Sequence, residues 1–216
     1  MNASKLTRKG TFGRWRLMPL ALALVLAALP QSPSQASQRM KNPARPAGSQ
    51  LSPRLDVNTF YEEGGRLFVG VDTRAARSTK TGDILPLGLA VANLGKSSVT
   101  LDRESLVLVA ADGARFPLIS LKEFRGEYNR SRIDFRLGDS LGGAMRTRFE
   151  DDRYVPWRLF PFKGEFANAT NAVDLGRWFW TQNYLYFRVP AEARSGTLSL
   201  LIDTGDGSPS VVNLEL

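Results

Sequence analysis

The chain of 216 residues contains no cysteine and no histidine. Without cysteine there can be no disulfide, and a lipid anchor attached to a cysteine at the processing site is excluded as well. Without histidine the chain lacks the commonest general base and metal ligand, so the usual zinc sites, a Ser-His-Asp triad and a Cys-His pair are excluded. A folded domain in this chain must therefore be stabilised by packing of its core.

Acidic residues are missing from the first 54 positions, and this changes how the overall charge should be read. The whole chain has 29 basic and 21 acidic residues, a formal charge of +8, and a pI of about 10.1. Nine basic residues lie in positions 1–54, so positions 55–216 hold 20 basic against 21 acidic residues, a net charge of −1. Binding of nucleic acid needs a basic patch on the folded domain itself. We therefore expect no nucleic-acid partner.

The start of the chain has the three-part organisation of a secretory signal peptide. An apolar run over residues 17–29 lies between a basic opening and a polar segment that ends in Ser34-Gln35-Ala36. The run is too short for a comfortable membrane span. Residues 7–12 weakly resemble a twin-arginine signal, which leaves that export route as the alternative. We expect residues 1–36 to be a cleaved signal peptide and the mature protein to be periplasmic or extracellular, with no integral membrane span.

The rest of the chain divides into a linker and one domain. Residues 37–54 are rich in proline, serine, glutamine and basic residues and lack apolar periodicity, which predicts a disordered basic linker. Residues 55–216 are numerous enough for a sizeable core. We therefore expect a single domain there.

Alternation of bulky and small residues predicts β-strands through much of this domain. In residues 84–93 one face carries bulky side chains and the other carries proline, glycine and alanine, which is the period of a strand. The bulky set is Leu85, Leu87, Leu89 and Val91. Asp112-Gly113 is a hairpin signal. Further strands are expected over residues 66–73, 105–111, 184–189, 197–202 and 211–216.

A helix is predicted where this strand pattern stops. Residues 120–123, Ser-Leu-Lys-Glu, match a capping box, and Leu121, Phe124 and Tyr128 would then share one helical face. Gly126 limits the length of this helix. Residues 130–183 follow no clear period. We therefore expect an insertion at about 120–183 with one or two short helices and some strands.

Two stretches of the domain resemble a known family. Residues 91–118 (VANLGKSSVTLDRESLVLVAADGARFPL) are similar to the strand–turn–strand core of small exported bacterial immunoglobulin-like domains of unknown function. Residues 183–190 (NYLYFRVP) and 197–203 (TLSLLID) resemble the closing strands of that family. The resemblance covers about half of the mature domain, and the motifs that carry it are turn motifs. The sequence departs from the family pattern across residues 120–183. It implies a mainly all-β fold, an immunoglobulin-like antiparallel β-sandwich with a binding role, and it brings no catalytic residue. In such a sandwich Phe187 and Leu200 should face the strand at 84–93 from the opposite sheet.

Aromatic residues are concentrated in the insertion and the strand that follows it. Of the 21 aromatic residues in the chain, 12 lie in positions 149–187. In an extended segment Trp178 and Trp180 would point to the same face. Aromatic and arginine side chains dominate binding hot spots, so this region predicts a surface for an envelope protein, a peptide or a glycan. The candidate binding residues are Trp157, Arg158, Arg177, Trp178 and Trp180. The alternative is that the insertion packs its aromatic residues internally, as aromatic residues normally do.

Charged residues of both signs also gather in the insertion. Residues 122–163 hold ten basic and seven acidic residues. Mixed signs favour a solvated surface of ion pairs, and the alternative is a site where guanidinium groups hold an anionic ligand. The acidic stretches 150–152 and 203–207 do not fit the spaced ligands of an EF-hand loop, so we expect no metal site and no cofactor.

Catalytic chemistry has little support in this composition. A carboxylate pair such as Asp134 and Asp139 could perform acid–base catalysis only if the fold placed the two side chains together. We therefore expect a non-enzymatic binding or accessory domain of the cell envelope. The alternatives are a glycan-active or peptidase-like enzyme that uses carboxylates, and a purely structural envelope protein.

The signal peptide gives a direct prediction about processing. Intact-mass analysis of the exported protein should place its first residue at or next to Ser37, because Ser34 and Ala36 supply the small residues that signal peptidase requires. An exported protein that retains Met1 would contradict this interpretation.

Overall fold

The computed structural model describes residues 50–79, 82–162, 168–205, 207 and 209–216. The described residues all belong to one compact unit that spans residues 34–216. The expected signal peptide and residues 37–49 of the expected linker lie outside the described residues. Within the described ranges, no helix is both long and apolar enough to cross a membrane.

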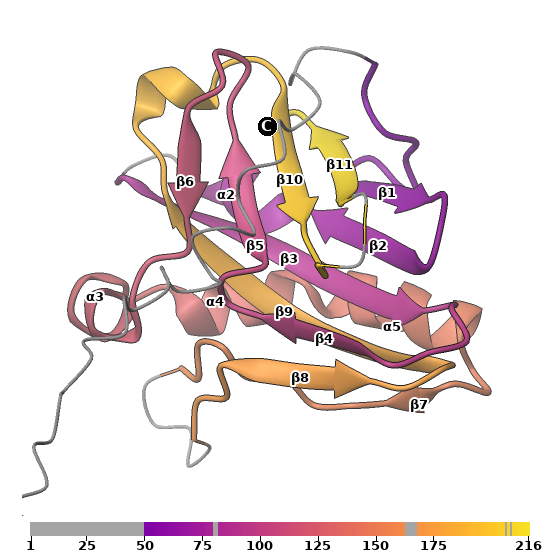
Figure 1. Ribbon diagram of the computed structural model, residues 1–216. Coiled ribbons are helices and arrows are strands. Elements are labelled where there is room, and N and C mark those ends of the chain that lie inside the picture. Colours follow the sequence, from indigo (N-terminus) through magenta and orange to yellow (C-terminus); the bar gives the residue numbers. More distant parts are fainter. Residues whose placement is uncertain (1–49, 80–81, 163–167, 206, 208) are drawn as a thin grey trace, which may run out of the picture. The chain divides into compact units, whose positions relative to one another are not determined.

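The described chain is mostly β-structure, as expected (Figure 1). The strands are β1 (Thr59–Glu63), β2 (Leu67–Asp72), β3 (Ile84–Asn93), β4 (Val99–Asp102), β5 (Leu106–Val109), β6 (Arg115–Pro117), β7 (Arg153–Tyr154), β8 (Ala172–Leu175), β9 (Phe179–Arg188), β10 (Leu198–Ile202) and β11 (Ser210–Leu214). They form a five-stranded sheet in the order β1-β2-β3-β9-β7, a four-stranded sheet in the order β11-β10-β5-β6, and the pair β4-β8. Neighbouring strands are antiparallel except β7 and β9, which are parallel.

Strand β3 is the centre of the larger sheet, and its bulky face lies in the main core as predicted. Leu85, Leu87, Leu89 and Val91 are fully buried in one cluster with Leu200 of β10, so both large sheets contribute to this core. Phe187 was expected across the core and this is wrong: it lies on β9 and pairs with Leu85 in the same sheet. Strand alternation identifies the face of a side chain but not the sheet that a strand joins.

The small face of β3 is also buried, because helix α5 (Asp139–Arg148) covers it (Figure 1). Ala90 and Ala92 lie in a second apolar cluster with Leu141 and Met145 of α5. On the neighbouring strand, a Cβ atom at Gly70 would lie 3.4 Å from the Cδ1 atom of Leu141. The glycine and alanine residues on this face of the sheet therefore leave the space in which α5 packs.

The insertion contains more helix than expected. Besides α5 it has α3 (Leu121–Glu127) and α4 (Ser131–Leu137), and α2 (Arg74–Ser78) and the 3-10 helix η1 (Ala191–Arg194) lie elsewhere. The capping box is confirmed: the Glu123 amide donates to the Ser120 hydroxyl at 3.2 Å, and the Ser120 amide donates to the Glu123 carboxylate at 2.7 Å. The other helices lack the usual signals, since neither α4 nor α5 has a side-chain N-cap.

The boundaries of the domain and of its insertion differ from the expected ones. Strand β9 begins at Phe179 and pairs with β3 from Arg188 back to Trp180, so the end of the expected insertion at 183 falls inside a core strand. Residues 50–54 were expected in the linker but contact the domain: the Ser52 amide donates to the Asn213 carbonyl at 3.0 Å, and Arg54 forms an ion pair with Glu215. Leu51 packs against the main core.

The packing of α5 on the sheet can be tested at two adjacent glycines. A Cβ atom at Gly142 would lie 2.4 Å from Oε1 of Gln182, whereas one at Gly143 would have no described atom within 4 Å. Gly143→Ala should raise the free energy of unfolding by about 1 kcal/mol, because alanine loses less backbone entropy in a helix. Gly142→Ala should give a smaller gain or a loss, because it displaces Gln182 from its hydrogen bond to the Gly138 carbonyl. Urea unfolding measures both, and equal gains would contradict this packing.

Candidate functional site

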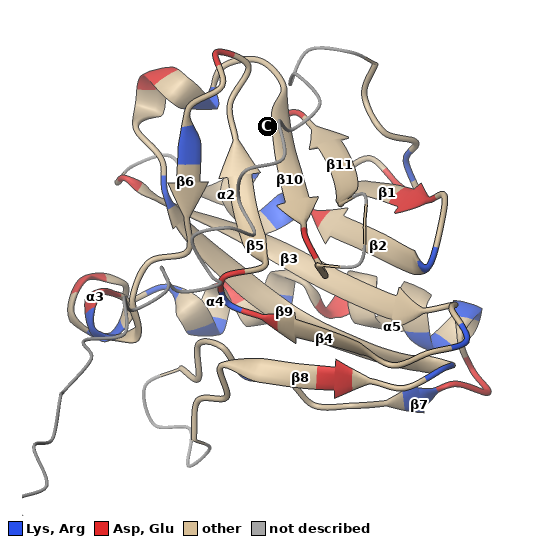
Figure 2. Ribbon diagram, viewed as in Figure 1, with Lys and Arg blue, Asp and Glu red and all other residues tan. Residues whose placement is uncertain are grey.

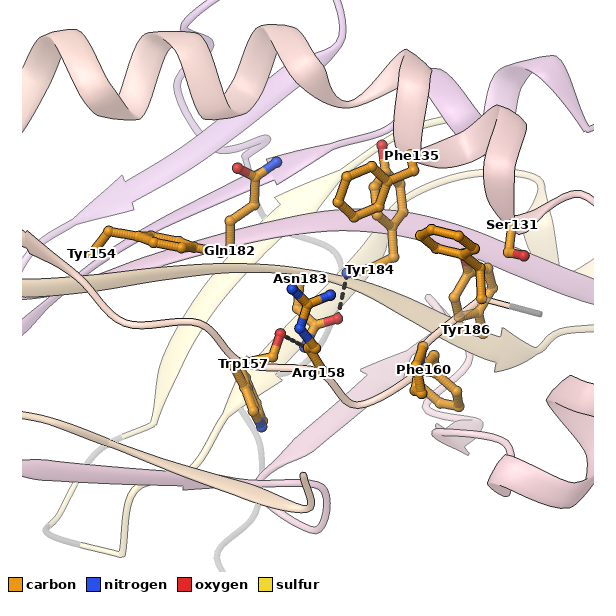
Figure 3. Close-up of a pocket in the computed structure, with 12 residues that line it drawn as sticks. Ser131, Phe135, Tyr154, Trp157, Arg158, Phe160, Gln182, Asn183, Tyr184 and Tyr186 are labelled. Atoms are coloured by element: carbon orange, nitrogen blue, oxygen red, sulfur yellow. Dashed lines mark hydrogen bonds between the residues drawn. The ribbon is translucent and has the colours of Figure 1, made fainter. Parts of the chain in front are cut away.

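A cavity of about 90 Å³ lies where the insertion meets strand β9 (Figure 3). Helix α4 provides Ser131 and Phe135, and β9 provides residues 182–184 and Tyr186. The segment 154–162, which begins at the last residue of β7, forms the rest of the wall. The cavity is therefore built by three parts of the chain that are far apart in sequence.

A larger hollow of about 880 Å³ adjoins this cavity. It is lined by residues 124–129, from helix α3 and the segment that follows it, together with Arg132 of α4. Ser131, Pro161 and Phe162 line both spaces. We call the smaller cavity and the larger hollow the paired pockets.

Polar side chains of β9 hold the segment 154–162 in place. The Thr181 hydroxyl donates to the Val155 carbonyl at 2.7 Å, and the Asn183 side-chain amide donates to the Trp157 carbonyl at 2.9 Å. The Asn183 side-chain oxygen accepts from the Tyr184 amide at 2.8 Å (Figure 3). These hydrogen bonds fix the cavity wall to the central sheet. Thr181 and Asn183 were not predicted as site residues, because their only signal in the sequence is a polar run inside an aromatic strand.

Aromatic rings form the walls between the pockets and the core. The Phe124 and Phe160 rings lie 4.7 Å and 5.1 Å from the Tyr186 ring, between ring centroids. Phe135 lies 6.0 Å from Tyr184 and 6.1 Å from Phe162 and is 58% exposed. The inner wall is therefore buried and rigid, and the outer wall includes a large apolar side chain in contact with solvent.

A buried carboxylate lies behind these walls. Asp134 of α4 is fully buried. The Tyr128 hydroxyl donates to its Oδ2 atom at 2.5 Å, and the Tyr186 hydroxyl lies 3.5 Å from the same oxygen. Oδ1 has no hydrogen-bond donor within the described part of the chain. Because Tyr128 caps α3 and Tyr186 is on β9, this carboxylate joins α3 and α4 to the sheet.

Burial shifts the pKa values of Asp134 and of the two tyrosines beside it. Loss of water raises the pKa of Asp134 above its ordinary value, and the Tyr128 hydroxyl, the Arg130 charge and the Tyr186 hydroxyl oppose the shift. The pKa values of Tyr128 and Tyr186 are also raised, first by burial and then by the nearby carboxylate. Both tyrosines therefore remain neutral hydrogen-bond donors.

The structure separates the five candidate binding residues. Trp157 and Arg158 both line the small cavity, with Trp157 only 3% exposed and part of the main core. Trp180 is buried beside α5, and its ring lies 4.8 Å from the Tyr154 ring at the cavity. Arg177 and Trp178 do not line either pocket.

The expectation that Trp178 and Trp180 share a face is wrong. Trp178 has a φ of 64°, so the backbone there is left-handed and not extended. This conformation directs Trp178 into solvent, where it is 45% exposed and lies 4.8 Å from the Arg177 guanidinium. The left-handed region is uncommon for a bulky residue, so it could not be predicted from the residue type.

The described charged residues of the insertion do not bring Asp134 and Asp139 together. Asp134 is buried, whereas the side chain of Asp139 is 85% exposed, so the two carboxylates do not share a cleft. Among the described residues, no group of three acidic side chains is placed to hold a metal ion. Some acidic residues of the insertion form ion pairs with arginines elsewhere in the domain. Glu123 and Glu127 lie 3.4 Å and 2.7 Å from the Arg188 guanidinium.

No family model matches the sequence, and no curated protein matches it either. Among solved structures, the chain is similar to the yjhA protein from Bacillus subtilis, with 11% sequence identity, coverage of 72% of this chain and 96% of that protein, and a TM-score of 0.37. A likeness at this level carries no argument about fold or function.

The buried carboxylate predicts a specific dependence of stability on pH. Folding raises the pKa of the Asp134 carboxyl. A group of this kind stabilises the fold fully at pH values below the pKa of the unfolded chain, which is about 3.9 for aspartate. The stabilisation is lost as the pH rises through the pKa of the folded protein. Asp134→Asn keeps an oxygen for the Tyr128 hydroxyl and removes the charge. From about pH 4 to about pH 8 its free energy of unfolding should therefore rise relative to that of the wild type.

Urea unfolding at both pH values measures this difference. Asp139→Asn is the matched control, because the exposed Asp139 side chain should leave the pH dependence unchanged. Parallel stability curves for the wild type and Asp134→Asn would contradict the assignment.

Proposed function

We propose that the mature protein is an exported, non-enzymatic binding domain of the cell envelope, built on an immunoglobulin-like antiparallel β-sandwich, and that its ligand occupies the paired pockets. The observation that carries this proposal is the pair of adjoining pockets with aromatic walls where the insertion meets β9. Ligand sites are usually concave, mostly apolar and equipped with a few polar groups. The paired pockets have this character.

The rest of the molecule is consistent with a binding domain. Two large sheets, antiparallel except for the pair β7 and β9, contribute to one core, as a sandwich requires. The helical insertion is the part that exceeds the needs of a sandwich, and long additions to compact domains are often functional. The secretory signal in the sequence supports export.

The chemistry of the pockets favours binding over catalysis. Glycoside hydrolysis needs two carboxylates at a defined separation. Among the described residues that line the paired pockets, Glu127 is the one carboxylate, and it forms an ion pair with Arg188. The enzyme alternative is tested by incubating the exported protein with cell-wall glycan and with a mixed peptide substrate, where release of products would favour it.

The binding proposal is tested by capture from envelope extract with the exported protein immobilised. The pocket variant is Phe135→Ala with Tyr154→Ala, because both side chains line the small cavity and are about half exposed, which leaves the core intact. Its captured material, measured by quantitative mass spectrometry, should fall about tenfold or more, as expected when aromatic hot-spot residues are truncated.

The matched control is Arg177→Ala with Trp178→Ala, an exposed cation–π pair outside the pockets. It should capture as much as the wild type. Loss of capture in this control, with retention in the pocket variant, would move the site to Arg177 and Trp178. Full retention in both variants would favour a structural role for the insertion.

A further inference from the structure

Helix α4 is held in the fold mainly by polar contacts. Its two buried residues are Ser131 and Asp134. Of its three apolar residues, Ile133 and Phe135 are about half exposed, and Leu137 is partly buried against the main core. Elements with few buried apolar contacts have low local stability, and the elements that move in a protein are drawn from this group. Within the pocket wall, α4 is therefore the element best placed to change its orientation.

Arginine side chains connect the two ends of α4 to helix α2. Arg130, which precedes α4, donates to the Ser78 carbonyl at 3.2 Å. At the other end, Arg74 donates to the Leu137 carbonyl at 3.2 Å. Gly138 then separates α4 from α5. Further basic residues along α4 are exposed (Figure 2). Because helix carbonyls point along the helix axis and arginine side chains are flexible, these contacts restrain the position of the axis more than rotation about it.

The observed orientation leaves the Asp134 carboxylate short of hydrogen bonds. Tyr128 and Tyr186 both approach its Oδ2 atom, while Oδ1 is buried and has no donor among the described residues. The charged and titratable groups that face it within the described chain are Tyr128 after α3, Arg130 before α4, and Tyr184 and Tyr186 on β9. Burial outweighs these contacts and raises the pKa of Asp134. The ionised carboxylate is therefore less stable in this orientation than in water.

Rotation of α4 about its own axis gives a second arrangement. Neighbouring residues of a helix are about 100° apart, so a rotation of about 100° brings Phe135 to the buried position of Asp134. The carboxylate then gains water and the Phe135 ring loses it, and both changes are favourable when the carboxylate is ionised. Protonated Asp134 favours the observed orientation, in which no charge is buried. The balance between the two orientations therefore depends on one proton.

We propose that helix α4 is a pH-dependent gate of the paired pockets, with Phe135 at the edge of the small cavity when Asp134 is protonated and turned inward when Asp134 is ionised. This proposal rests on the proposed function and adds the regulation of its site. Phe135 lines the small cavity in the observed orientation, so turning α4 removes part of the cavity wall (Figure 3).

The direction of the pH dependence follows from the two environments of Asp134. In water the carboxyl has the ordinary pKa of about 3.9, and in the observed orientation its pKa is raised. Below both values the observed orientation is favoured fully. Between them, each pH unit shifts the ratio of the two orientations by about tenfold toward the turned one. The gate therefore opens toward low pH and closes as the pH rises.

The orientation can be measured with one fluorine label and without any ligand. 4-Fluorophenylalanine at position 135 keeps the ring, and the change of its fluorine NMR signal between light and heavy water reports how exposed the ring is. From about pH 4 to about pH 8 the signal of a half-exposed ring should give way to that of a buried ring, by about tenfold in ratio per pH unit within the transition. A ring whose exposure is the same at both pH values would overturn the gate.

Variants of the labelled protein assign the transition to Asp134. Asp134→Asn should keep the observed orientation at every pH, because its neutral side chain still accepts a hydrogen bond from Tyr128. Asp139→Asn is the matched control and should behave as the wild type, since Asp139 is exposed. A transition that persists in Asp134→Asn would assign the pH dependence to another group and refute the proposal.

A second pair of variants tests the contact that opposes turning. Tyr128→Phe removes a donor to Asp134 and should move the transition to lower pH. Tyr154→Phe is the matched control, because the described hydrogen bonds to Asp134 come from Tyr128 and Tyr186. Tyr128→Phe with the same transition as Tyr154→Phe would contradict the role given to this hydrogen bond.

Capture from envelope extract connects the gate to binding. At about pH 8 the wild type should capture several-fold less than at about pH 5, and Asp134→Asn should capture similar amounts at both, because its pockets keep Phe135 in their wall. Equal pH dependence in the two proteins would overturn the regulation of the site. The proposed function fails separately, when the pocket variant captures as much from envelope extract as the wild type.

Discussion

The attachment of the helical insertion depends on one buried carboxylate. Asp134 accepts a hydrogen bond from Tyr128 and lies beside the hydroxyl of Tyr186, so α3, α4 and β9 meet at a single oxygen atom. Burial of a carboxylate is unfavourable unless hydrogen bonds compensate for lost water. The two hydroxyls are therefore what keeps α4 in its observed orientation, and the same two tyrosines supply wall to the pockets.

Strand β9 connects this attachment to the rest of the fold. One part of it completes the main core, where Leu185 and Phe187 are fully buried beside β3. Another part binds the segment 154–162 through Thr181 and Asn183. Because β3 is packed on both faces, by the main core and by α5, the strand paired with it has little freedom to move. The pockets are consequently built beside a strand that is packed on both faces.

The sequence predicted those features whose signals are local. Alternation identified β3, Asp112-Gly113 identified the turn between β5 and β6, and the capping box identified α3. Helix α4 could not be found in this way, because its two buried residues, Ser131 and Asp134, are polar, while Ile133 and Phe135 are about half exposed. The start of β9 was missed because residues 181–183 are polar. Thr181 and Asn183 are polar because they bind the segment 154–162, which is distant in sequence. Among the residues of the candidate site, Trp157 and Arg158 were predicted from the local concentration of aromatic and arginine residues. That they line one cavity together with residues of α4 is visible only in the folded structure.

The orientation of α4 is best understood as a local cost that serves the pockets. Ile133 and Phe135 are about half exposed, and Asp134 between them is buried. A helix advances by about 100° per residue, so a rotation of about 100° would bury Phe135 and return the carboxylate to water. That rotation would satisfy the usual pattern of an amphipathic helix, but it would remove Phe135 from the cavity edge and the acceptor from Tyr128 and Tyr186. Departures from the usual local pattern are expected at functional sites. The inverted face of α4 therefore supports the same location for function as the pockets beside it.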